Sequence, residues 1–177
     1  MNETMIDYKD FIGRGEEKEL LRSGLSQEDY ASNSANFVAE QLRLIDIELH
    51  SIVVEASRWS DVYWGTVVAS RDDYEGWESL CRIGTRVVFR NGTFSAEWFR
   101  NRYVKGGVEG ASKKVFSTYL RKGKGFAYPA SLFKSEPLWV QQQVAATEAM
   151  YAPLRERAAA LTTMRRALRV YERLSKQ

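Results

Sequence analysis

The feature that most constrains the fold is a long stretch without Gly or Pro, from Ser26 to about Ser60. Within it, apolar residues recur at alternating spacings of four and three: Val38, Leu42, Ile45, Leu49, Ile52, Ala56 and Trp59. This is the a/d repeat of a heptad seam. Ser26, with Asp29 three positions on, forms an imperfect capping box at its start. The pattern predicts a long helix over 26–62, ended by Gly65. Its seam packs either on the core of its own chain or in an intermolecular or antiparallel coiled coil, and pairing with a second copy predicts a homodimer.

After this helix the periodicity changes to two, which is typical of strands. The runs Thr85–Phe89 and Thr93–Trp98 flank Asn91-Gly92, and Asn-Gly between alternating runs is the strongest short-range signal for a two-residue hairpin. A third β-rich run, from Lys113 to Lys122, follows a Gly-rich loop at 106–110. We therefore expect a three-stranded antiparallel sheet within a basic segment, 80–135.

The last segment, 136–177, is predicted to be helical. Ser135 before Glu136-Pro137 is a plausible helix start, and Pro153 predicts a kink or break near Ala152. Apolar residues at a/d positions alternate with arginines, which either pair with acids of the first helix or contact phosphates. The chain is thus predicted to be an α+β domain. It has a flexible acidic leader over 1–25, a long N-terminal helix, a sheet, and C-terminal helices covering the apolar face of the sheet.

Charge is distributed unevenly along the chain. Residues 1–80 hold seven Lys/Arg and seventeen Asp/Glu, whereas 81–177 hold nineteen and six. Within 81–134 twelve basic residues stand against two acidic ones. Such asymmetry points to a polyanion as the partner of the basic half, or to packing of the two halves on each other.

The hairpin register decides which side chains share a face. Pairing across Asn91-Gly92 predicts one buried face, made of Val87, Phe89, Phe94, Ala96 and Trp98, with Phe116 and Leu120 from the third strand. The opposite face and its flanks hold the residues predicted to bind nucleic acid: Arg82, Arg86, Arg90, Phe99, Asn101, Tyr103, Lys105, Lys113, Ser117, Tyr119, Arg121, Lys122 and Lys124.

These residue types have distinct uses on DNA. Arginine binds guanine with two hydrogen bonds, and Asn101 has the groups to do the same for adenine. Lysines bind phosphates, and the aromatic rings stack on bases if the ligand is single-stranded. The alternative is a solvated sheet face, on which Arg86 and Glu97 form an ordinary cross-strand pair.

Other function classes find little support in the residues. The single histidine, His50, has no nearby ligand partner, Cys81 has no histidine base in its sequence context, and no Walker-type glycine loop is present. We expect no catalytic activity, metal or cofactor, although a nuclease built from scattered carboxylates stays an alternative. The absence of a long apolar run predicts no membrane contact, and a cytoplasmic location is expected.

A family resemblance rests on the segments Ala96–Arg100 and Val115–Gly125, with Tyr128-Pro129, Phe133, Trp139, Leu154–Arg157 and Tyr171-Glu172 continuing it. Over roughly 95–175 the chain resembles the MobI-type mobilisation proteins of conjugative plasmids and integrative elements. The resemblance implies a DNA-binding accessory factor that acts at the origin of transfer and helps a separate relaxase to act there. It implies no catalytic residues. The alternative is an oligomeric scaffold or protein-interaction module without specific DNA binding.

Overall fold

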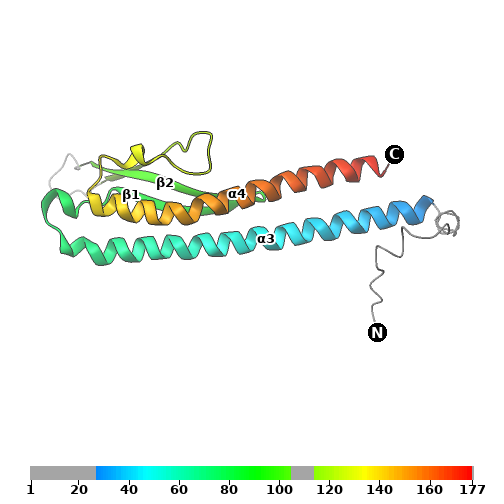
Figure 1. The fold of residues 1–177 in the computed structure, drawn as a ribbon, viewed down its shortest axis with the longest axis horizontal. Coiled ribbons are helices and arrows are strands. Elements are labelled where there is room, and N and C mark those ends of the chain that lie inside the picture. Colours follow the sequence, from blue (N-terminus) through cyan, green and yellow to red (C-terminus); the bar gives the residue numbers. More distant parts are fainter. Residues whose placement is uncertain (1–26, 105–113, 177) are drawn as a thin grey trace, which may run out of the picture.

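The structure is a computed structural model that describes residues 27–104 and 114–176. Two long helices lie antiparallel, and a three-stranded sheet covers part of the pair (Figure 1). The elements in chain order are α3 (Gln27–Ser70), short 3-10 turns at Arg71–Asp73 and Gly76–Ser79, β1 (Ile83–Arg90), β2 (Thr93–Val104), β3 (Lys114–Tyr119), a further turn at Ala130–Phe133, and α4 (Leu138–Leu174). The predicted α+β architecture is confirmed, with one C-terminal helix in place of several. The leader at 1–25, Ser26 and the Gly-rich loop at 106–110 lie outside the described residues.

Helix α3 does not end at Gly65, as the sequence pattern predicted, but continues to Ser70. Glycine costs about 1 kcal/mol in a helix interior. Tyr63 and Val67, on either side of Gly65, are 1% and 6% exposed in the core. Their burial offsets that cost, so the helix passes through the glycine.

Helix α4 likewise runs without a break through Pro153, so the predicted break near Ala152 is wrong. Proline removes one backbone hydrogen bond from a helix. Tyr151 and Leu154, on either side, are 0% and 2% exposed and anchor both halves of α4 to the core. The helix starts at Leu138, with Pro137 as its N-cap residue rather than Ser135.

The heptad seam of α3 is used within the chain. Ile45, Leu49 and Ile52 are at most 4% exposed and join one core cluster with Tyr151, Leu154 and Ala158 of α4. Of the two alternatives for the seam, the structure shows the intramolecular one. A homodimer stays a prediction, and it requires a surface other than this seam.

The sheet has the register predicted from the Asn91-Gly92 turn. Asn91 and Gly92 both have positive φ, as a type I′ turn requires, and β1 pairs with β2 from Arg90↔Thr93 to Ile83↔Arg100. The inner face packs on the helices, and Trp98 there is fully buried. Phe116, predicted to be buried, is 53% exposed. Since α3 packs on β1 and α4 on β2, the inner side of β3 lies outside the helical cover.

A buried ion pair attaches the segment after β3 to α4. Glu148 and Arg155 lie 2.6 Å apart with side chains 9% and 7% exposed. Glu148 also accepts hydrogen bonds from Trp98 Nε1 at 2.6 Å and from the backbone N–H of Tyr128 at 2.8 Å. Arg155 donates to the carbonyl oxygens of Ala96 and Phe126. These contacts cover the edge of β2 that β3 leaves unpaired, and they hold the basic segment 121–134 in place.

Candidate nucleic-acid interface

The outer face of the sheet carries the predicted residues Arg86, Phe99, Asn101, Ser117 and Tyr119 side by side. Phe99 lies opposite Tyr119, and Asn101 opposite Ser117, in the β2–β3 pairing. The Ser117 hydroxyl donates to Asn101 Oδ1 at 2.6 Å, which leaves the Asn101 amide N–H groups available to a ligand. The register thus assembles a polar and aromatic surface from residues sixteen to twenty positions apart in the chain.

Arg86 is engaged on both sides of its guanidinium. Its Nε and Nη2 atoms both donate to Glu97 Oε2 at 3.1 Å, and its Cζ lies 4.3 Å from the centre of the Tyr119 ring. The cross-strand pair that the sequence offered as the alternative is therefore present. Arg86 can contact a base only if it first releases the carboxylate of Glu97. Its guanidinium also covers one face of the Tyr119 ring, so that face is closed to a stacking base.

Phe99 is half-buried rather than a free stacking platform. Its ring lies over Gly84, the residue opposite it on β1, where a Cβ atom would overlap the ring. Trp64 of α3 and Tyr119 flank it, with ring centres 6.5 and 6.1 Å away. Trp64 also donates its indole N–H to the Thr85 carbonyl at 3.1 Å. This aromatic group covers part of the outer face that the sequence analysis treated as exposed.

Arg82 is held in an ion pair with a buried acid and is not free on the surface. It bonds through Nε and Nη2 to the fully buried carboxylate of Glu136, at 3.3 and 3.2 Å. Arg100 Nε lies 3.2 Å from the same carboxylate, although not in hydrogen-bond geometry. Two cations thus neutralise one buried acid at the start of α4, and Arg82 is poorly placed to give up that role to a ligand.

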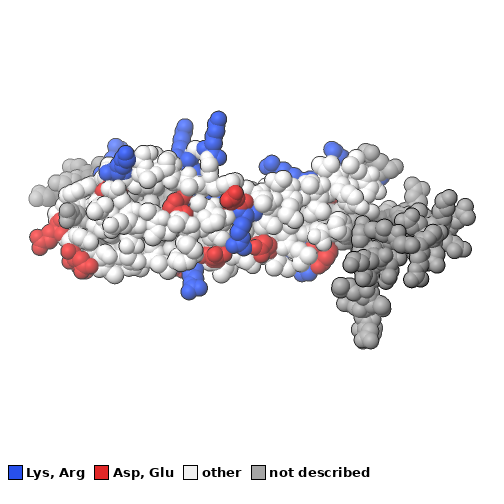
Figure 2. Space-filling model, in the orientation of Figure 1, with Lys and Arg blue, Asp and Glu red and all other residues white. Residues whose placement is uncertain are grey.

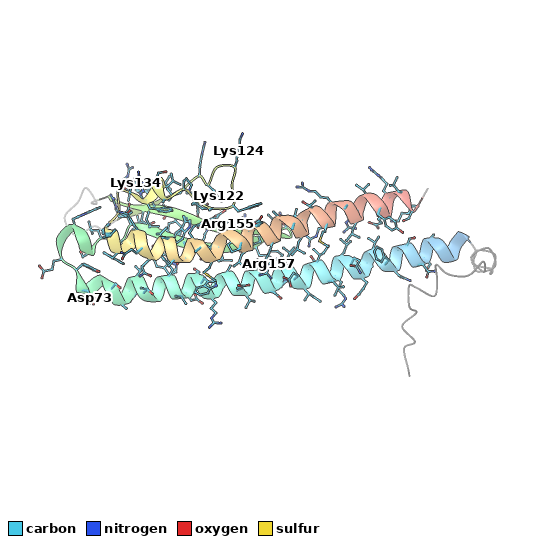
Figure 3. All side chains as sticks on the ribbon, viewed as in Figure 1. Asp73, Lys122, Lys124, Lys134, Arg155 and Arg157 are labelled. Carbon is cyan, nitrogen blue, oxygen red and sulfur yellow. The ribbon has the colours of Figure 1, made fainter. Side chains whose placement is uncertain are left out.

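Other cations have no partner among the described residues and so are available to an anion. Arg90 is exposed beside the hairpin turn, and Arg121, Lys124 and Lys134 are exposed along the segment between β3 and α4. Lys122 differs from these, because it donates to the Gly125 carbonyl and lies over Phe126, but it makes no ion pair with a described residue. In Figure 3 the labelled Lys124 and Lys134 point away from the helices on the upper side of the molecule.

The arginines of α4 divide into two groups. Arg157 pairs with Glu48 and Glu55, and Arg165 pairs with Asp46, so these arginines join α4 to α3. Arg166 and Arg173 have no partner in the described part of the chain, and Arg169 pairs only with Glu172 of its own helix. Spacings of three and four place 166, 169 and 173 on one side of α4.

Together these cations form what we call the basic edge: Arg121, Lys122, Lys124, Lys134, Arg166 and Arg173. Figure 2 shows Lys and Arg along the upper edge of the molecule, over the segment between β3 and α4 and over the C-terminal half of α4. The sequence left phosphate contact by the C-terminal arginines, Arg166 and Arg173 among them, as an open alternative and did not single out Lys134. A signal was present in the recurrence of arginine at 166, 169 and 173.

One group of exposed acids lies away from the basic edge, although other exposed acids, such as Glu156 of α4, lie elsewhere on the surface. Asp61, Asp72, Asp73 and Glu75 are exposed near the C-terminal end of α3 and in the turns that follow it, and Asp73 is labelled there in Figure 3, on the side away from Lys124. Lys105 and Lys113 lie outside the described residues. Tyr103 pairs with Val115 in the ladder, but its side chain is outside the described part.

Several residue types that enzymes use lie within the described ranges. No group of three His, Cys, Asp or Glu side chains within 27–104 and 114–176 is placed to hold a metal ion. Burial raises the pKa of the Cys81 thiol, which lies 3.6 Å from the Tyr63 hydroxyl. His50 is exposed and packs on Phe89. No described helix has a stretch long and apolar enough to cross a membrane.

Comparison with known proteins places this fold in a family. The family model described as MobI protein matches residues 52–169, which is more than half of the chain. The match runs from the second half of α3 through the sheet and most of α4, so it includes nearly all of the basic edge. No curated protein and no solved structure matches the chain significantly. The chain therefore belongs to the MobI family, and with it to the accessory proteins of conjugative mobilisation.

Proposed function

We propose that this protein binds DNA at the origin of transfer and helps a separate relaxase to act there. The observation that carries the proposal is the gathering of exposed cations without an ion-pair partner along one edge of the described residues. Cations that bind phosphates release counterions from the DNA, and this supplies nearly all of the non-specific affinity and a large share of the specific affinity of a DNA-binding protein.

The geometry favours the backbone of duplex DNA over stacked single-stranded bases. Phe99 is packed between Trp64 and Tyr119, and Arg86 covers one face of Tyr119. Stacking of a base on either ring first requires these contacts to open. The cations of the basic edge need no such rearrangement, because they make no competing ion pair within the described residues.

Sequence recognition is assigned to the residues beside this edge that keep free donors. Arg90 is exposed and unpaired at the hairpin turn, and Asn101 keeps its amide N–H groups. A β-hairpin fits the major groove, where arginine and asparagine read base edges. Arg86 would add a base contact only if it gave up its hydrogen bonds to Glu97.

A paired substitution tests the DNA surface. Replacing Arg121 and Lys124 with Ala is expected to weaken binding to duplex DNA about tenfold and to lower the salt dependence by about two ions. Fluorescence anisotropy across a range of salt concentrations measures both quantities. The matched control is Arg43→Ala with Arg58→Ala, which removes the same charge from α3 and should leave binding close to wild type.

The comparison of DNA sequences tests the second half of the proposal. A duplex from the element's own transfer origin should bind more tightly than a scrambled duplex, and purified relaxase should nick a transfer-origin plasmid faster when the protein is present. Equal binding of the Arg121/Lys124 variant and wild type would place the DNA surface elsewhere. Absence of any duplex binding by the wild type would instead favour a scaffold function.

A further inference from the structure

The two helices continue beyond the sheet as a stalk, which we define as residues 27–47 of α3 and 164–174 of α4 (Figure 1). Each stalk helix carries a second apolar stripe in addition to its seam. On α3 the stripe includes Phe37 and Leu44, which are 51% and 44% exposed. On α4 it runs at spacings of three, four and three through Met164, Ala167, Tyr171 and Leu174. A stripe at this spacing is the usual means by which one helix packs on another.

The two stripes meet in one continuous surface. A groove of about 410 Å³ between the helices is lined by Phe37, Gln41, Met164, Ala167, Leu168 and Tyr171. The rings of Phe37 and Tyr171 lie edge to face, with centres 6.0 Å apart. Met164 and Tyr171 are 52% and 45% exposed. We call this surface, with Leu44, the stalk face.

Charges next to the stalk face are already neutralised within the chain. Glu48 and Glu55 follow Leu44 on the same side of α3, and both pair with Arg157, which Figure 3 labels between the helices. Arg43 pairs with Glu40. The unpaired Arg166 and Arg173 are two positions from Met164 and Tyr171, about 200° away around α4. The stalk face is thus an apolar surface without net charge, on the opposite side of α4 from the basic edge.

We propose that the stalk face binds a second copy of this chain, and that the two stalks form a four-helix bundle. A twofold axis through the groove sets the α3 stripe of each copy against the α4 stripe of the other, which is how two helical hairpins bury such stripes. Neutral borders let identical surfaces meet without like-charge repulsion. Both basic edges then face outward, so that one dimer presents two DNA-binding surfaces.

The size of the stalk face sets the strength of the contact. Two helices, each about 10 Å across, over a rise of roughly 20 Å present about 400 Å² per copy. Stable interfaces bury about 800 Å² per partner and at least about 1,200 Å² in total, so this contact, of about 800 Å² in total, makes a weak, transient dimer. It should form reversibly and depend on concentration. The seam residues Ile45, Leu49 and Ile52 take no part, because they are buried within each copy.

Sedimentation velocity of the full chain, from about 1 to about 100 µM, tests the proposal. The mass of the wild type should rise with concentration from 20.3 kDa toward twice that value. The double variant Met164→Glu/Tyr171→Glu should keep the monomer mass throughout and keep its helix content by circular dichroism. The matched control is Val54→Glu/Val68→Glu, which places two acids at positions 71% and 69% exposed outside the stalk face and should dimerise like the wild type.

Several outcomes would overturn this assignment. A wild type that stays monomeric over the whole range removes the dimer, and a folded double variant that still dimerises moves the interface elsewhere. If the glutamates reduce the helix content, Met164→Gln/Tyr171→Gln takes their place with the same two criteria. The result does not depend on DNA, so it stands or falls separately from the proposed DNA binding.

Discussion

Two Arg–Glu ion pairs lie on opposite faces of the sheet in different surroundings: one belongs to α4 and packs against the inner face, and the other links β1 and β2 on the outer face. On the inner side Glu148 and Arg155 are 9% and 7% exposed, and the backbone and Trp98 take up further bonds of the pair. On the outer face Glu97 and Arg86 are 32% and 49% exposed. Removing one partner of a buried ion pair destabilises the fold strongly, because the other charge is then buried without compensation. An exposed pair contributes little and can be exchanged for a ligand. The inner face of the sheet therefore contributes mainly to stability, whereas the outer face is the one available for binding.

The largest expected difference between the faces is at Trp98 and Phe99, neighbours that point to opposite sides of β2. Trp98→Ala should lower the free energy of unfolding by about 3–5 kcal/mol, since it empties a fully buried site and removes the hydrogen bond to Glu148. Phe99→Ala should cost roughly 1–2 kcal/mol, as for a partly buried ring. Urea denaturation measures both. A larger loss at Phe99 than at Trp98 would contradict the assignment of the faces.

Matched acid-to-amide changes sharpen the comparison of the ion pairs. Glu148→Gln should destabilise the fold by about 3 kcal/mol, because it leaves the Arg155 charge buried without compensation. Glu97→Gln should cost less than about 1 kcal/mol and should free Arg86, so DNA binding should strengthen slightly. Thermal denaturation and anisotropy check the two effects. Similar stability losses in both variants would remove the distinction between the pairs.

A smaller effect is expected at Gly84, where the outer face is packed rather than open. Gly84→Ala should destabilise by about 1–3 kcal/mol through overpacking. The added methyl group would overlap the Phe99 ring and lie 2.9 Å from Trp64, and these rings hold each other in place. Gly65→Ala, with nothing within 4 Å of its Cβ position, is the control and should stabilise α3 by up to about 1 kcal/mol. A neutral Gly84→Ala would show that Phe99 moves freely.

The candidate site could be predicted in part. Alternation and the Asn91-Gly92 turn predicted the outer positions of Arg86, Phe99 and Tyr119, because side-chain period and turn type are local properties of a strand. The partners of these residues could not be predicted. Arg82 forms an ion pair with Glu136, which lies 54 positions away, and Phe99 packs on Trp64 of α3. The free cations of the basic edge became distinguishable from the paired ones only when such contacts were known.

The sequence by itself determined the long first helix, the hairpin register and the excess of positive charge in the second half. Each of these depends on residues a few positions apart or on composition alone. The tertiary structure decided that the seam of α3 packs on α4 of the same chain, that the helices pass through Gly65 and Pro153, and that Arg157 binds Glu48, 109 positions away. Such outcomes are set by burial against distant elements. Burial energies of several kcal/mol outweigh local costs of about 1 kcal/mol for a helical glycine and about 3 kcal/mol for a helical proline.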